Sequence, residues 1–354
     1  MLYQTENQHG GDVYGGGITL DFSANTNPLG TSPSVLEAVR RGLPQLHRYP
    51  DPYCRQLVQA IAAHEQVPAS YVLCGNGAAD LIYAYCAALR PRTAVELAPT
   101  FVEYGSGLAQ VGCRVDLYFL HQAQNFDLDE RFLPFLKEKK PEVVFLCTPN
   151  NPTGRLLPLP LLEQVLQGCA AWGARVFLDE CFLDLTEDGV SAKALLAAHP
   201  ELLILKAFTK SYGMAGIRLG YCLCADSALL HRMASASQPW NVSSLAQSAG
   251  VAALTEQGFL RKTRELIRTE RRWLTDNLTA LGFWVCPSQA NYLLFRGPRG
   301  LREGLLRQGI AIRGCENYSG LDDGWYRIAV RPHEENEALI TAIRQFCKEK
   351  SLWQ

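Results

Sequence analysis

The chain has 354 residues, with 34 basic and 35 acidic side chains for a formal net charge of -1, and 47% of its residues are hydrophobic. This balance is typical of a globular protein with a large core and a second, smaller domain. It gives no electrostatic reason to expect binding to nucleic acid or to a membrane surface. No apolar run reaches membrane-spanning length and the first residues do not resemble a signal peptide, so we expect a cytoplasmic protein.

The 12 cysteines are scattered singly through apolar segments, as at Cys74, Cys147 and Cys181. One close pair, Cys222 and Cys224, lies in a strand-like run and has no second pair to complete a zinc site. We therefore predict buried thiols in a reducing compartment, without a bound metal.

Short β-rich runs alternate with helical stretches between about residues 70 and 225. This alternation predicts an α/β fold with a mainly parallel sheet covered on both faces, whose ligands gather at the carboxyl ends of the strands. The expected strands are 71–75, 93–98, 114–120, 143–149, 175–180, 202–209 and 218–224, with a helix over 78–89.

The pattern changes after about residue 240. A charged amphipathic helix is expected over 259–282 and a last helix over 335–350, with short β-like runs between them. We predict an N-terminal arm and part of the small domain in 1–45, a large domain in 46–238, and a small α+β domain in 239–354.

Two polar features follow expected strands in the first half of the large domain. In "VLCGNGAADL", the helix that begins near Gly77 and Ala78 would direct free amides at a phosphate, although a simple turn is the alternative. In "CTPNNPTG", Asn151 offers a neutral amide that can donate to an oxygen, and again a plain turn is the alternative.

Two charged residues follow later strands. Asp179 ends an apolar run, and burying an unpaired carboxylate costs on the order of several kcal/mol, so a protonated heterocyclic nitrogen or an internal arginine is needed as its partner. Lys210 also follows an apolar run. A desolvated lysine loses its proton readily enough to act as a Schiff-base nucleophile, whereas a surface lysine is the alternative.

In chain order, these four features match the phosphate, phenolic oxygen, pyridine nitrogen and aldehyde of pyridoxal phosphate. Over nearly its whole length the sequence resembles the aspartate-aminotransferase-like, fold-type I family of pyridoxal-phosphate enzymes. The resemblance implies a mainly parallel central sheet, a smaller α+β C-terminal domain and pyridoxal 5'-phosphate as cofactor.

The resemblance also implies roles for individual residues. Lys210 would form the Schiff base with the cofactor and move protons at the substrate α-carbon, and Asp179 would keep the pyridine nitrogen protonated. Tyr49 in "HRYPDPY" would reach the cofactor phosphate of the neighbouring subunit, which implies a homodimer with shared active sites. The remaining cofactor contacts would come from Asn151 at the ring oxygen, Phe101 on the ring face, and Gly77, Ala78, Thr209 and Arg218 at the phosphate.

Two positions depart from the family pattern. Phe182 stands where many relatives have a tyrosine that touches the ring oxygen, and Ala207 stands where a serine or threonine is frequent. The cofactor is therefore expected to have fewer hydroxyl contacts here.

Within the family, the segments "HGGDVYGGG" and "IRGCENYSGLDD", together with Phe182, are most similar to enzymes that decarboxylate L-threonine O-3-phosphate in cobalamin biosynthesis. This likeness implies a carboxy-lyase in which Arg327 binds the substrate carboxylate, with serine phosphate as a variant substrate. Its other substrate contacts would be His9, Gly10 and Arg313 at the phosphate, with Asn25 and Asn151 nearby.

Two other functions remain open. Histidinol-phosphate aminotransferase is the alternative within the family, because both reactions use the same apparatus. A noncatalytic regulator is the alternative outside it, and the presence of Lys210 and the lack of a helix-turn-helix extension argue against that function.

Overall fold

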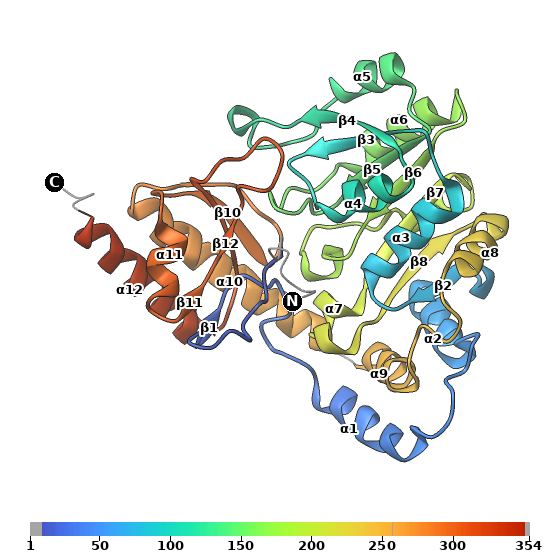
Figure 1. The fold of residues 1–354 in the computed structure, drawn as a ribbon, viewed down its shortest axis with the longest axis horizontal. Coiled ribbons are helices and arrows are strands. Elements are labelled where there is room, and N and C mark those ends of the chain that lie inside the picture. The colour runs from blue at the N-terminus through green and yellow to red at the C-terminus, as the bar shows by residue number, and fades with distance from the viewer. Residues whose placement is uncertain (1–8, 257, 351–354) are drawn as a thin grey trace.

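A computed structural model describes residues 9–256 and 258–350 of the chain. Figure 1 shows two lobes: a larger one built on the central sheet, and a smaller one that contains most of the C-terminal segment and the first strand of the chain.

The larger lobe contains a seven-stranded sheet of order β2-β8-β7-β6-β5-β3-β4. β8 runs antiparallel to both of its neighbours, and the other pairs are parallel, which confirms the predicted mainly parallel sheet. The strands are β2 (Val72–Gly75), β3 (Thr93–Ala98), β4 (Arg114–Phe119), β5 (Val143–Cys147), β6 (Arg175–Asp179), β7 (Leu202–Ala207) and β8 (Gly220–Cys224).

Alternate residues of the central strands enter two separate cores. On β5, Val144 packs into one core, whereas Phe145 packs into the other. Successive side chains of a strand point to opposite faces, so a sheet that is covered on both sides needs the continuous apolar runs seen in the sequence. One face is covered by α3 (Ala78–Leu89), α4 (Glu103–Gln110) and α8 (Ser227–Ala236), and the other by α2 (Arg55–Glu65), α5 (Phe132–Lys139), α6 (Leu159–Ala170) and α9 (Ser244–Thr255).

The smaller lobe contains an antiparallel sheet of order β12-β13-β10-β9 and a parallel pair, β1 with β11. Helices α10, α11 and α12 contribute to its own core, and α10 and α12 begin within two residues of the predicted helix starts. The elements are β1 (Leu20–Asp21), α10 (Phe259–Ala280), β9 (Trp284–Val285), β10 (Tyr292–Arg296), α11 (Leu301–Leu306), β11 (Ile310–Ala311), β12 (Arg313–Gly314), β13 (Trp325–Ala329) and α12 (His333–Glu349).

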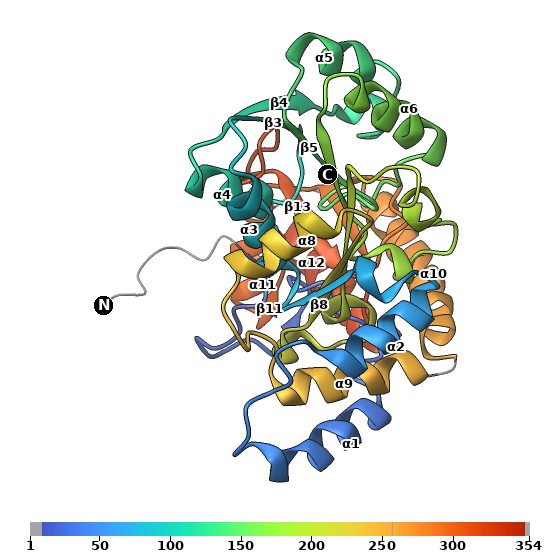
Figure 2. The same ribbon diagram turned by 90° about the vertical axis from the view of Figure 1, so that its right-hand side faces the viewer.

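Helix α1 (Pro33–Gly42) packs against α9, and α9 packs against α2 of the larger lobe, as Figure 2 also shows. The predicted domain boundaries at residues 45 and 238 remain predictions. The short helix α7 (Phe208–Ser211) follows β7 at the carboxyl end of the central sheet.

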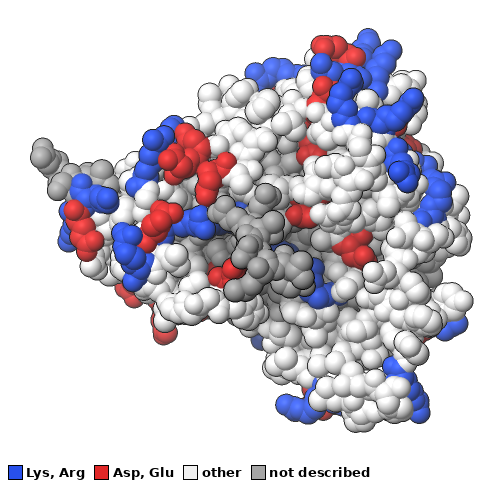
Figure 3. Space-filling view, in the orientation of Figure 1, with Lys and Arg blue, Asp and Glu red and all other residues white. Residues whose placement is uncertain are grey.

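All twelve cysteines lie in the described part of the chain and form no disulfide with one another, and all but Cys113 are buried, which confirms the predicted buried thiols. Figure 3 shows acidic and basic side chains interspersed around the rim of one face. Across the described residues, no helix has both the length and the apolar character needed to cross a membrane, and no cluster of metal-binding side chains is present.

Candidate active site

A cavity of about 350 Å³ lies where the carboxyl ends of the central strands face the smaller lobe. β6 ends at Asp179, Asn151 follows β5, and Lys210 lies on α7 directly after β7. The predicted site residues that line this cavity are His9, Gly10, Asn25, Ala78, Phe101, Asn151, Asp179, Thr209, Lys210, Arg218, Arg313 and Arg327.

Asp179 is 5% exposed and its carboxylate accepts two hydrogen bonds. The Tyr104 hydroxyl donates to Oδ2 at 2.6 Å and the Cys181 backbone N–H donates to Oδ1 at 2.8 Å. Burial raises the pKa of Asp179, while the hydrogen bonds from Cys181 and Tyr104 oppose this rise. The cation whose charge lowers the pKa of Asp179 is Lys210 and not an internal arginine, and the carboxylate lines the cavity, where it is available to a protonated nitrogen.

Lys210 is partly exposed to the cavity, and its Nζ lies 5.5 Å from the centroid of the Phe182 ring. Desolvation, with repulsion from Arg327 and Arg218, lowers the pKa of Lys210 to about 8. A substantial fraction of the amine is therefore neutral near physiological pH, as a nucleophile requires.

One end of the cavity is suited to a phosphate. Gly77, with a φ of 86°, precedes the first turn of α3, and a Cβ atom there would lie 2.6 Å from Nη2 of Arg218. A Cβ atom at Gly220 would lie 2.7 Å from the backbone N of Ala78. These two glycines therefore let a guanidinium approach the free amides of a helix N-terminus, a combination that favours an anion.

Two arginines define the opposite side. Arg313 on β12 and Arg327 on β13 are register partners on adjacent strands, and they are only 7% and 6% exposed. Arg327 donates to the Ser23 carbonyl at 2.9 Å and to Oδ1 of Asn151. The Asn25 amide oxygen lies 3.1 Å from Nε of Arg327 in the amide orientation that satisfies both groups.

The N-terminal arm reaches the cavity at His9, whose Nε2 lies 2.7 Å from Oε1 of Glu103. The centroids of the His9 and Phe101 rings are 6.0 Å apart. Glu103 and Tyr104 were not predicted as site residues. The spacing from Phe101 could have indicated Tyr104, because the Tyr104 backbone N–H donates to the Phe101 carbonyl in the turn before α4 and the two ring centroids lie 5.6 Å apart.

Two predicted residues do not line the cavity. Gly77 lies against the Arg218 guanidinium. Tyr49 is 79% exposed and stacks on Trp240 with ring centroids 4.7 Å apart, so its contact with a neighbouring subunit stays a prediction.

The two departures from the family pattern both lie at the cavity. Phe182 packs edge-on against Tyr292 with centroids 5.0 Å apart, and Ala207 lines the wall beside Lys210. Neither side chain offers a hydroxyl, as expected from the sequence.

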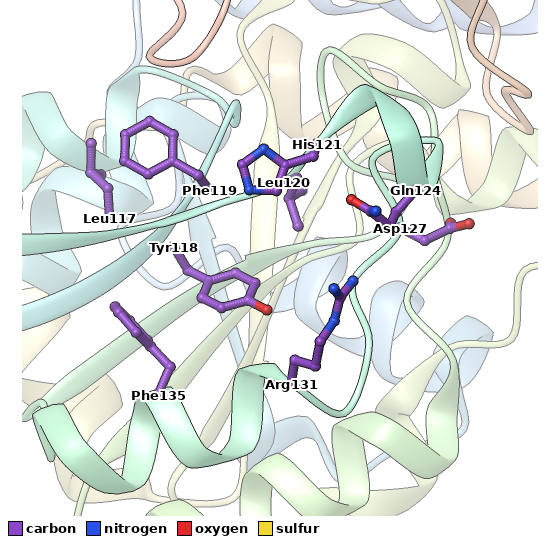
Figure 4. A pocket seen from close by; sticks show the side chains of 9 residues that line it. All are labelled: Leu117, Tyr118, Phe119, Leu120, His121, Gln124, Asp127, Arg131 and Phe135. Carbon is purple, nitrogen blue, oxygen red and sulfur yellow. The ribbon is translucent and has the colours of Figure 1, made fainter.

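A second cavity of about 310 Å³ lies beside the edge strand β4 (Figure 4). Its charged side chains already have partners, since Asp127 pairs with Arg155 and Arg131 pairs with Asp129. None of the predicted site residues lines it. We therefore place the chemistry in the first cavity.

The groups around the first cavity fit pyridoxal phosphate. Asp179 faces it with a buried carboxylate, Lys210 with an amine of lowered pKa, and Arg218 with a guanidinium beside the first amides of α3. These are the groups that would hold the ring nitrogen, the aldehyde carbon and the phosphate of the cofactor.

Comparisons with known proteins agree with this geometry. A family model, "Aminotransferase class I and II", matches residues 18–343. The chain is 40% identical over 329 residues to threonine-phosphate decarboxylase of Salmonella typhimurium (92% of this chain, 90% of that protein), and 35% identical over 350 residues to histidinol-phosphate aminotransferase of a Geobacillus species (96% and 93%). The crystal structure of histidinol-phosphate aminotransferase from Clostridium acetobutylicum matches with a TM-score of 0.87 at 27% identity, covering 93% of this chain and 99% of that chain. The chain therefore belongs to the class I and II aminotransferase family, with the predicted aspartate-aminotransferase-like fold, and is a pyridoxal-phosphate-dependent enzyme.

Proposed function

We propose that the protein decarboxylates L-threonine O-3-phosphate to (R)-1-aminopropan-2-ol O-phosphate and carbon dioxide, as a step of cobalamin biosynthesis. The observation that carries this proposal is the buried pair Arg313 and Arg327, which are register partners and line the same cavity as Lys210. Like charges opposite one another on neighbouring strands are destabilising, so the presence of this pair favours a ligand with two anionic groups. A phosphorylated amino acid has both a phosphate and a carboxylate.

The two anionic groups have different environments in the cavity. Arg327 would bind the carboxylate, because the Asn151 and Asn25 amides and the Ser23 carbonyl already hold its guanidinium in place. Arg313, together with His9 and the Gly10 amide, would bind the phosphate.

Asp179 and Lys210 would stabilise charge and transfer protons. When bound, the cofactor supplies a ring that withdraws the electrons released at the substrate α-carbon. Asp179 would keep the ring nitrogen protonated, and Lys210, whose pKa of about 8 lies near neutrality, would transfer a proton at the α-carbon.

The orientation of the substrate carboxylate would decide which bond breaks. The bond that lies perpendicular to the cofactor ring is the one that cleaves, because only there do its electrons overlap with the ring. Arg327 comes from the smaller lobe and Lys210 from the larger, so the relative position of these two side chains would set that orientation. The 40% identity to threonine-phosphate decarboxylase and the phenylalanine at position 182 support carbon dioxide as the leaving group.

Histidinol-phosphate aminotransferase is the second candidate, supported by the Geobacillus relative at 35% identity. Histidinol phosphate has a phosphate but no carboxylate. In that reaction Arg327 would bind the carboxylate of the second substrate, an amino-group acceptor such as 2-oxoglutarate.

The test is to incubate the purified holoenzyme with threonine phosphate, serine phosphate or histidinol phosphate, with and without 2-oxoglutarate, and to measure carbon dioxide and amine products. We expect carbon dioxide from threonine phosphate without any need for 2-oxoglutarate, and a slower release from serine phosphate as a variant substrate. A product that forms only when 2-oxoglutarate is present would refute the decarboxylase assignment.

The proposal includes a cytoplasmic homodimer with shared active sites. Large apolar side chains are exposed on and after α1, including Leu36, Leu43 and Leu46, and the stacked rings of Tyr49 and Trp240 are exposed as well. If Tyr49 serves the neighbouring site, an equal mixture of inactive Tyr49→Ala and Lys210→Ala subunits should regain about a quarter of the wild-type activity. About half of the dimers are then hybrids, and one of the two sites in each hybrid keeps both residues. A mixture that stays inactive while hybrids form would contradict shared sites.

A further inference from the structure

Glu103 lies in the first turn of α4 at the cavity, and both of its carboxylate oxygens have partners. Oε1 lies 2.7 Å from Nε2 of His9, and Oε2 accepts a hydrogen bond from the Tyr83 hydroxyl at 2.7 Å. The Glu103 side chain is 16% exposed, whereas that of His9 is 43% exposed. Tyr83, on α3, therefore holds one oxygen of Glu103 in place while the other oxygen holds the N-terminal arm.

The next arm residues are fixed on the opposite wall of the cavity. The Gly11 N–H donates to Oγ of Ser23 at 2.8 Å, and a Cβ atom on Gly10 would lie 2.2 Å from the Ser23 carbonyl oxygen. That same carbonyl accepts the hydrogen bond from Arg327. Residues 9–11 thus connect Glu103 of the larger lobe to the wall that contains Arg327.

The Glu103 carboxylate lines a cavity that also contains Arg313, Arg327 and Arg218 and is therefore suited to anions. An isolated carboxylate there would repel an anionic substrate. The hydrogen bonds with His9 and Tyr83 lower the pKa of Glu103 and occupy both oxygens of its carboxylate, so neither oxygen faces an anionic ligand unpaired.

We propose that Glu103, anchored by Tyr83, is a positioning residue that holds His9 and the adjoining Gly10 and Gly11 at the cavity and thereby sets the preference for phosphorylated substrates. The inference rests on the proposed function, in which His9 and the Gly10 amide bind the substrate phosphate. Glu103 acts through His9 and does not itself contact the substrate. Its contribution belongs to substrate binding rather than to bond cleavage.

The test is a double-mutant cycle of Glu103→Gln and His9→Ala, assayed with threonine phosphate. Glu103→Gln keeps the shape of the side chain and removes its charge, so we expect KM to rise about 10- to 100-fold, as for the loss of a charge-assisted hydrogen bond, with kcat changed less than about threefold. In the His9→Ala background the same change should alter KM by less than about twofold, because the two residues act as a unit. Tyr83→Phe should also raise KM, by a smaller factor than Glu103→Gln.

Two controls separate positioning from a general structural effect. Glu138→Gln removes an exposed glutamate on α5 and should leave KM unchanged. The affinity for pyridoxal phosphate and the thermal midpoint of Glu103→Gln should match those of the wild type. Additive effects of Glu103→Gln and His9→Ala, or a loss confined to kcat, would overturn the inference.

Binding measurements distinguish this inference from the proposed function. Calorimetric titration with O-phospho-L-threonine should show weaker binding in Glu103→Gln by about the same factor as KM. If the wild type binds threonine phosphate and Glu103→Gln weakens that binding, but no carbon dioxide is released, the role of Glu103 stands and the decarboxylase assignment fails. If carbon dioxide is released and Glu103→Gln binds as tightly as the wild type, the decarboxylase assignment stands and the role of Glu103 fails.

Discussion

Glu65 allows a quantitative test of the ion-pair network beneath the active-site lysine. Its carboxylate is 2% exposed, and its two oxygens lie 3.0 Å from Nζ of Lys206 and 2.9 Å from Nζ of Lys193. Lys206 also pairs with Asp184, and Asp184 accepts a hydrogen bond from Ser211, the residue after Lys210. The network therefore supports the turn that presents Lys210.

The stabilisation from Glu65 follows from its pKa. Burial alone would raise the pKa of Glu65, but the charge of Lys206 and hydrogen bonds from Tyr221 and Lys193 lower it from 4.5 to about 2. At about 1.4 kcal/mol per tenfold change in proton affinity, this lowering corresponds to about 3 kcal/mol of folding free energy at neutral pH. Because the folded state binds the proton more weakly, the stabilisation is complete above the unfolded pKa and is lost as the pH falls toward 2.

The assay is urea unfolding of the wild type and Glu65→Gln, followed by tryptophan fluorescence. The variant should be less stable by about 3 kcal/mol at pH 7 and by about 2 kcal/mol at pH 3.5, where protonation of the wild type begins to remove the difference. As a control, Glu37→Gln, which removes an exposed ion pair on α1, should leave the unfolding midpoint unchanged. A difference below about 1 kcal/mol at pH 7, or one that does not shrink in acid, would refute the reasoning.

Three further predictions concern the active site. Lys210→Ala should abolish turnover and the yellow colour of the purified protein, and retained activity would refute Lys210 as the nucleophile. Attachment of added pyridoxal phosphate to the apoenzyme requires the neutral amine, so its rate should rise with pH and level off above about 8; a rate that climbs on to a pH of about 10 would show an unshifted lysine. Arg313→Ala should weaken binding of threonine phosphate about 10- to 100-fold while cofactor affinity changes little, and equal losses of both would make Arg313 structural.

Site residues can be predicted from the sequence where their position follows from the pattern of a single segment. Apolar runs followed by a charged residue located Asp179 and Lys210, because parallel strands bring their carboxyl ends to one edge of a sheet. The same runs did not show that β8 is antiparallel to its neighbours, since a buried strand has the same pattern in either direction.

Contacts that depend on distant segments were not predictable in the same way. The hydrogen bond from Tyr104 joins residues 75 positions apart, and Glu103 meets the arm across 94 positions. Gly220 appeared as an ordinary strand residue, yet its missing side chain is what lets β8 approach the backbone of Ala78. Such requirements arise from packing between distant segments, and the residue pattern of a single segment does not show that packing.

The arginine pair and the lysine are attached to different sheets, and they meet across the seam where Asn151 contacts Arg327 and the Tyr292 hydroxyl contacts the Asn150 carbonyl. A small rotation of one lobe on the other would tilt the substrate without altering any group that touches it. Related enzymes of this family can therefore diverge through substitutions at this contact between the lobes, while the set of reactive side chains stays the same.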